Sequence, residues 1–192
     1  TGESIGDSSE FTTATSLSLD NRLKTTTSII WKDMEKWLVD RKYESPDIST
    51  ILKEITNHPD WESGNSLTIF MNSNDPTNAQ TRTVYSSRGL ADKAPVLSIT
   101  YTKSTRVQPR NAVVSKTLSI QDGGDDFEVG EVDNIFASTG FDLDFCQCSG
   151  YTTVGMRFTK MNLPSDAVVR SAYIRFIADS TSNSPSPRVV IA

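Results

Sequence analysis

Short runs in which apolar and polar residues alternate make up most of this 192-residue chain, and they break at Gly, Pro, Asn or Asp. Successive side chains of a strand point to opposite faces, so the alternation predicts strands with one buried and one solvated face. Many short strands separated by turn residues are typical of an all-β sandwich. The sequence therefore predicts a jelly-roll-like antiparallel β-sandwich with these strands: Thr13–Leu19, Ser28–Trp31, Ser66–Met71, Thr81–Ser86, Val96–Tyr101, Val113–Ile120, Glu128–Val132, Phe141–Phe145, Thr153–Lys160, Ala167–Ala178 and Arg188–Ile191.

The segment Ser45–Trp61 follows a different period. Its apolar residues stand at i, i+3, i+4 and i+7, which is one face of a helix: Ile48, Ile51, Leu52 and Ile55. Pro46 and Asp47 precede the pattern and Pro59 follows it, as helix start and stop signals do. The sequence predicts one short amphipathic helix whose apolar stripe covers an open end of the sandwich or, alternatively, binds a partner.

Charge and hydropathy exclude two classes of partner. The chain carries 19 Lys and Arg against 24 Asp and Glu, a net charge of -5, and has no basic stripe for a phosphate backbone. Its apolar runs, such as Ser171–Ala178, are far shorter than the roughly 20 residues that span a bilayer. Neither nucleic acid nor a membrane span is expected.

Both ends of the chain look cut. Arg188–Ile191 reads as a strand, but neither a turn nor a partner strand follows it. Thr1–Phe11 is a polar opening without an initiator Met, a basic region or an apolar leader. We therefore expect this sequence to begin and end within a module.

Two groups of motifs carry a resemblance to a known family. The second half of the chain holds "DDFEVGEVDN" and "VGMRFTKMNLPSDAVVRSAYIRFIAD". The first half holds "SPDISTILKEITNHPDWESGNSLTIF" and "APVLSITY". These resemble the beginning and the end, respectively, of a β-sandwich module that recurs in large secreted proteins, often beside polysaccharide-active domains. The motifs cover nearly the whole chain, but the two halves stand in reverse order.

This reversed order implies that the chain is one repeat unit of an assembly in which the module recurs. We expect residues 1–102 to be the C-terminal half of one sandwich module, 103–111 a linker and 112–192 the N-terminal half of the next. Either the modules form a covalent tandem array, or each half is completed by a neighbouring subunit through strand addition by Val189, Val190 and Ile191. A head-to-tail contact that does not close produces a filament. A plain fragment of a larger protein is the third reading.

Acidic residues follow two glycines in "QDGGDDFEVGEVD" and recur in "DLD". Calcium takes six to eight oxygen ligands in irregular geometry, so such a loop could hold a structural calcium ion. The best candidate ligands are Asp125, Asp126 and Glu128, with Asp144 and Asp179 as supplements. The alternative is a set of solvated loop acids.

Aromatic residues offer a surface for sugars, because a ring face can stack on a pyranose. Trp31 and Trp61 occupy family-like positions in the core. Trp37 lies in the charged stretch "KDMEKWLVDRKY" and is expected to be exposed, so Trp37 and Tyr43 are the candidate sugar contacts.

Ser- and Thr-rich stretches are candidate sites for O-linked glycans, namely Glu10–Ser16, Thr102–Arg106 and Ser180–Arg188, whereas no Asn-x-Ser/Thr sequon is present. Cys146 and Cys148 form either a disulfide at a hairpin tip or two thiols, since two ligands are too few for a structural zinc site.

Catalysis has little support in the sequence, because a nucleophile needs an adjacent base and the one histidine, His58, stands beside the helix end. The sequence thus predicts an extracellular or cell-surface structural protein that polymerises with itself head to tail, with calcium and O-linked glycans or polysaccharide as further partners. The alternative is a carbohydrate-binding module of a larger secreted polysaccharide-active protein.

Overall fold

The computed structural model shows an antiparallel β-sandwich, which confirms the predicted all-β class. It describes residues 2–11, 22–73, 80–103, 112–130, 136–137, 141–145, 152–182 and 185–191. The elements run in chain order β1 (Ile29–Trp31), β2 (Lys42–Glu44), α2 (Ser49–Thr56), β3 (Leu67–Ser73), β4 (Arg82–Tyr85), η2 (Ala91–Lys93), β5 (Val96–Thr102), β6 (Val113–Ser119), β7 (Asp126–Gly130), β8 (Phe136–Ala137), β9 (Asp142–Phe145), β10 (Thr152–Phe158), β11 (Val168–Ile177) and β12 (Val189–Ile191).

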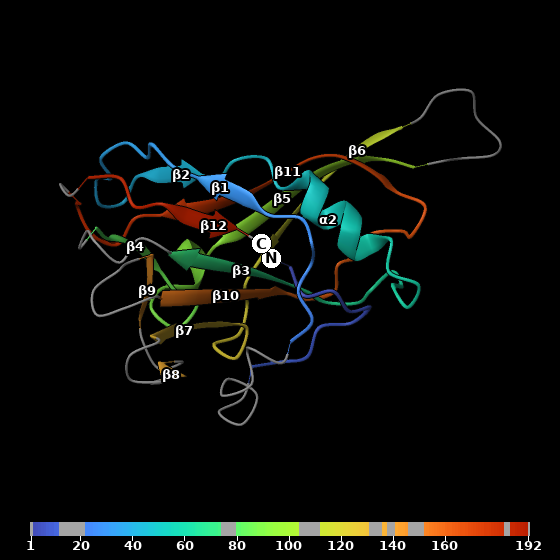
Figure 1. Ribbon diagram of the computed structural model, residues 1–192, viewed down its shortest axis with the longest axis horizontal. Coiled ribbons are helices and arrows are strands. Elements are labelled where there is room, and N and C mark those ends of the chain that lie inside the picture. The colour runs from blue at the N-terminus through green and yellow to red at the C-terminus, as the bar shows by residue number, and fades with distance from the viewer. Residues whose placement is uncertain are drawn as a thin grey trace.

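Three sheets make up the sandwich (Figure 1). The largest has the order β1-β12-β3-β10-β7-β8, the second has the order β2-β11-β5-β6, and β4 pairs with β9. All of these pairings are antiparallel. Strands from residues 1–102 alternate with strands from residues 112–192 throughout the second sheet and over β1-β12-β3-β10 of the largest one, where β7 and β8 also come from residues 112–192. The two halves that the sequence analysis assigned to different modules thus complete one sandwich within a single chain.

The predicted strands coincide with observed ones in the part of the chain that the structure describes. Residues 12–21, which include the strand predicted for Thr13–Leu19, lie outside it, as do Cys146 and Cys148. Two strands were not predicted. The three residues of β2, Lys42–Glu44, are too polar and too few to show alternation, and β8 has two residues.

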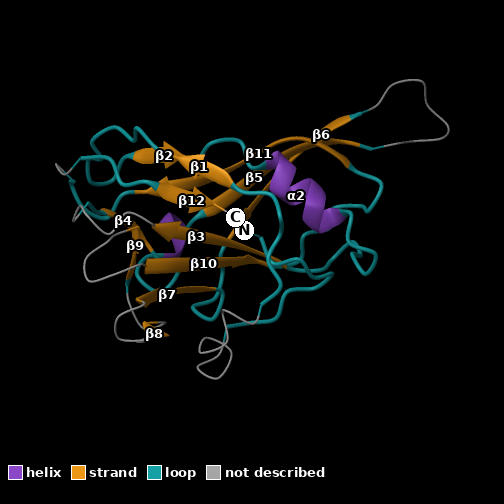
Figure 2. Cartoon of the chain, in the orientation of Figure 1, coloured by secondary structure: helices purple, strands orange, loops and turns teal. Residues whose placement is uncertain are grey.

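Helix α2 forms where the period predicted it (Figure 2). The side chains of Ile48, Ile51, Leu52 and Ile55 are at most 1% exposed, and α2 packs against β11. The Asp47 carboxylate ties the two elements together, because it accepts hydrogen bonds from the Ser49 amide at 2.9 Å and from the Ala172 amide at 3.0 Å. The apolar stripe is therefore part of the core. This agrees with the prediction that it covers the sandwich and not with the alternative that it binds a partner. No helix in the described ranges has the length and apolar character needed to cross a membrane.

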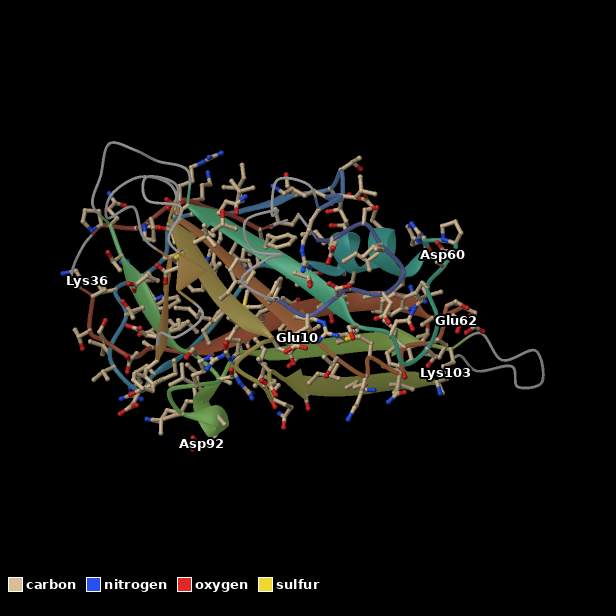
Figure 3. All side chains as sticks on the ribbon, turned by 90° about the horizontal axis from the view of Figure 1, so that it is seen from below. Glu10, Lys36, Asp60, Glu62, Asp92 and Lys103 are labelled. Atoms are coloured by element: carbon tan, nitrogen blue, oxygen red, sulfur yellow. The ribbon has the colours of Figure 1, made fainter. Side chains whose placement is uncertain are left out.

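The core joins the two larger sheets and the helix in one apolar cluster. Its aromatic part packs ring against ring: Phe176 lies 5.9 Å from Trp31 and 5.2 Å from Phe145, between ring centroids. In Figure 3, Lys36 marks one end of the molecule, and Asp60, Glu62 and Lys103 mark the opposite end.

The helix stripe yields a first prediction. Ile51→Ala should lower the free energy of unfolding by about 2–5 kcal/mol, because it removes fully buried methyl groups and leaves a cavity against β11. Urea unfolding measures this difference. Lys53→Ala, an exposed change in the same helix, is the control and should stay within about 0.5 kcal/mol. Equal effects of the two changes would contradict the packing of α2.

Candidate functional site

The predicted assembly strand is a central strand of the largest sheet. Val189, Val190 and Ile191 pair with β1 on one side and with β3 on the other. The side chains of Val189 and Ile191 are fully buried, while Val190 is half-buried. Burying an aliphatic side chain of this size contributes about 1.5–3 kcal/mol. The three residues therefore connect β1 to the rest of the sheet and fill its core face.

The N-terminal segment continues the strand position of β12. Ile191 lies opposite Met71 of β3, and Gly2 lies opposite Ile69 farther along the same strand. The Glu3 amide donates to the Thr68 carbonyl at 3.0 Å, and on the other side the Thr25 amide donates to the Gly2 carbonyl at 2.8 Å. Figure 1 accordingly places the N and C labels beside each other. β12 and residues 2–3 thus lie end to end between the same two neighbouring segments.

A buried ion pair fixes this N-terminal segment. Arg22 Nη1 lies 2.8 Å from Glu3 Oε2, and each side chain is 8% exposed. The Ser8 hydroxyl contacts both the Glu3 carboxylate and the Thr68 hydroxyl, and the Arg22 guanidinium lies 4.8 Å from the centre of the Phe11 ring. Removing one member of such a pair leaves a buried charge without a counter-ion.

The segment that leads into β12 is held by Arg82. This side chain of β4 is fully buried. It donates to the Ser182 hydroxyl at 3.0 Å, to the Pro185 carbonyl at 3.3 Å and to the Glu35 carbonyl at 3.0 Å. Arg82 was not predicted from the sequence to have a role of this kind. The available signal was its place on the same face of the predicted strand as Val84, two residues on.

The predicted calcium ligands Asp125 and Asp126 are engaged by protein groups. Asp125 forms an ion pair with Arg157 at 2.6 Å, and Asp126 accepts hydrogen bonds from the Ser87 amide at 2.6 Å and the Ser87 hydroxyl at 3.0 Å. Burial raises the pKa of both carboxyls, while these partners act in the opposite direction. Both acids consequently connect β7 to neighbouring elements.

The other predicted ligands lie near β9. Asp144 accepts a hydrogen bond from the Thr83 hydroxyl at 2.6 Å, its amide donates to Glu128 at 2.8 Å, and the Asp179 amide donates to the Thr83 carbonyl at 3.0 Å. Burial raises the pKa of Glu128 to about 7, and the charges of Asp144 and Asp142 add to this, against the hydrogen bond from the Asp144 amide.

A cation site is not apparent in the described ranges. Within them, no group of three or more His, Cys, Asp and Glu side chains has an arrangement that could hold a metal ion. The predicted calcium therefore stays a prediction without a ligand set in this part of the chain.

The expected exposure of Trp37 is wrong, because its side chain is 1% exposed. The Trp37 ring stacks on the ring of Tyr43 with centroids 4.5 Å apart and planes 9° apart, and Trp31 lies 5.8 Å away. Tyr43 is half-buried. The core packing expected of Trp31 and Trp61 is confirmed at 8% and 3% exposure.

Comparisons with known proteins assign no family. No protein-family model and no curated protein matches the chain. Among solved structures, a fructofuranosidase from Schwanniomyces occidentalis complexed with fructose is similar at 9% identity and a TM-score of 0.22. The match covers 86% of this chain and 33% of that enzyme. A similarity this weak carries no argument about fold or function.

Glu128 yields a prediction about pH. Between about pH 4.5 and 7 the folded state holds a proton that the unfolded state has released, so stability falls as the pH rises through this window. Glu128→Gln keeps an acceptor for the Asp144 amide and removes this dependence. The gain in unfolding free energy at pH 8 should reach up to about 3 kcal/mol.

Urea unfolding at pH 5 and pH 8 measures the effect. The exposed Glu62→Gln is the matched control and should keep the pH dependence of the natural chain. An unchanged dependence in Glu128→Gln would show that this carboxyl does not hold the proton.

Proposed function

We propose that this chain is a structural subunit of an extracellular filament, in which β12 of one copy fills the strand position between β1 and β3 of the next copy. The observation that carries the proposal is the end-to-end arrangement of β12 and residues 2–3 along β3. In a filament, Ile191 of one copy would meet Gly2 of the next within one shared strand position.

Exchange of β12 preserves the contacts of the sandwich. The same main-chain hydrogen bonds to β1 and β3 form, and Val189 and Ile191 fill the same core positions, whichever copy supplies them. Domain swapping of an identical element is a low-cost route to association for this reason. Exchange changes the path of the segment between Ile177 and Val189. In this segment Pro185 and Pro187 favour an extended chain.

The contact between a donated strand and the copy that receives it has a direction. The donated strand and the slot that receives it are different parts of the molecule, so donation from each copy to the next is a heterologous contact, whereas two copies that trade strands close as a dimer. Heterologous contacts whose rotation does not close give open filaments. In a covalent tandem array, the same junction between Ile191 and Gly2 would be spanned by the chain itself.

The sheet topology also allows two copies to exchange the whole range 112–192. In the two larger sheets, every strand from residues 1–102 lies beside a strand from residues 112–192, so the second range of one copy could complete the first range of another. The filament proposal includes both forms. Calcium and O-linked glycans remain parts of it, and the exposed Ser180 and Thr181 before β12 are candidate glycan positions.

The alternative role, a carbohydrate-binding module of a larger polysaccharide-active protein, is implied by the family resemblance, with Trp37 as the residue expected to contact a sugar. Trp37 is buried, so its own ring is not an exposed sugar contact, and the arrangement of β12 and residues 2–3 makes the filament the function that we propose first.

Disulfide trapping tests the proposal. Val190 lies opposite Asn72, and cross-strand partners in an antiparallel pair have Cα atoms about 4.5–5.5 Å apart, which suits a disulfide. In a background with Cys146→Ser and Cys148→Ser, Asn72→Cys with Val190→Cys should give a ladder of covalent multimers on a non-reducing denaturing gel after oxidation. A disulfide-bonded monomer alone would contradict exchange.

Two further pairs act as controls. Val129 lies opposite Thr153 within residues 112–192, so Val129→Cys with Thr153→Cys should bond within one chain in every case. Asn72 also lies opposite Thr153. Asn72→Cys with Thr153→Cys should therefore give monomers if only β12 is exchanged, and multimers if the whole range 112–192 is exchanged.

A further inference from the structure

Both larger sheets end on the same side of the sandwich. β1 and β2 are the first strands of their sheets, so each pairs on one side alone within the described sheets. The chain between them, residues 32–41, lies at the end of the molecule that Lys36 marks in Figure 3. A recess of about 610 Å³ opens there.

The floor of this recess is aromatic. Trp31, Trp37 and Tyr43 line it. Trp37 covers one face of the Tyr43 ring, so a ligand could stack on the other face alone. The Leu38 amide donates to the Tyr43 hydroxyl at 2.7 Å and fixes the direction of the ring. A half-buried, oriented aromatic ring is the feature that a sugar ring stacks on.

The rim of the recess is charged, and its charges are not used within the described parts of the chain. Asp33, Glu35, Lys42, Glu44 and Arg175 line the recess. Their side chains have no hydrogen bond or ion pair with any other described residue, although Glu44 lies opposite Arg175 across the strand pair β2–β11. Three carboxylates and two cations with nearly balanced charge do not select for an anion.

We propose that this recess binds a neutral saccharide of one or two units. One ring would stack on the open face of Tyr43, while the rim carboxylates accept hydrogen bonds from hydroxyl groups and Arg175 donates to ring or hydroxyl oxygens. Its volume lies within the range of small-molecule sites. The proposal does not depend on filament formation, since every lining residue belongs to one chain.

Tryptophan fluorescence tests this site, because two of the three tryptophans of the chain line the recess. Cellobiose, maltose and lactose are titrated as probes, with glucuronate as a charged comparison. At least one neutral disaccharide should give a saturable change. Glu44→Gln and Arg175→Gln should each weaken its affinity about tenfold, as the loss of a hydrogen bond to a charged group does.

Arg170→Gln is the matched control, because Arg170 lies on β11 like Arg175 but is exposed and does not line the recess. It should leave the affinity unchanged. Tyr43→Ala should abolish the fluorescence response, and circular dichroism shows whether this variant stays folded. The absence of a saturable change with every neutral probe, a response to glucuronate alone, or equal affinities of Glu44→Gln, Arg175→Gln and Arg170→Gln would overturn the proposal.

Discussion

The strand position between β1 and β3 is the constraint on which the rest of the structure depends. β12 and residues 2–3 fill it, and without them β1 loses its partner strand and one edge of β3 is left unpaired. An unpaired strand edge exposes main-chain donors and acceptors, which then pair with any strand available. The position must therefore be filled, and its hydrogen bonds do not distinguish a strand of the same chain from a strand of another copy.

Buried polar groups hold the segments on either side of this position. The ion pair of Arg22 with Glu3 fixes the N-terminal side, and Arg82 fixes the segment before β12 through Ser182 and Pro185. Such groups contribute directional contacts in a sandwich whose core is otherwise apolar. Arg82 also binds the Glu35 carbonyl, so it connects the approach to β12 with the loop that forms the recess.

The sequence predicted the elements whose signal is local. Alternation located most strands, and the spacing of Ile48, Ile51, Leu52 and Ile55 located the helix, because both patterns report one buried face. The prediction that Trp37 is exposed was wrong, since a charged neighbourhood along the chain does not tell which side chains fold inward onto Tyr43. Likewise, the acids after Gly124 look like a cation site in sequence, but Arg157 and Ser87, which are distant in the chain, engage two of them.

The central claim is that copies of this chain complete one another along one strand position. The most direct test is negative-stain electron microscopy of the native material, with denaturing mass determination on the same sample. The account predicts filaments, built either from chains with the mass of one period and joined by exchanged strands or from chains of many periods joined covalently. Single compact particles of one-period mass would contradict it.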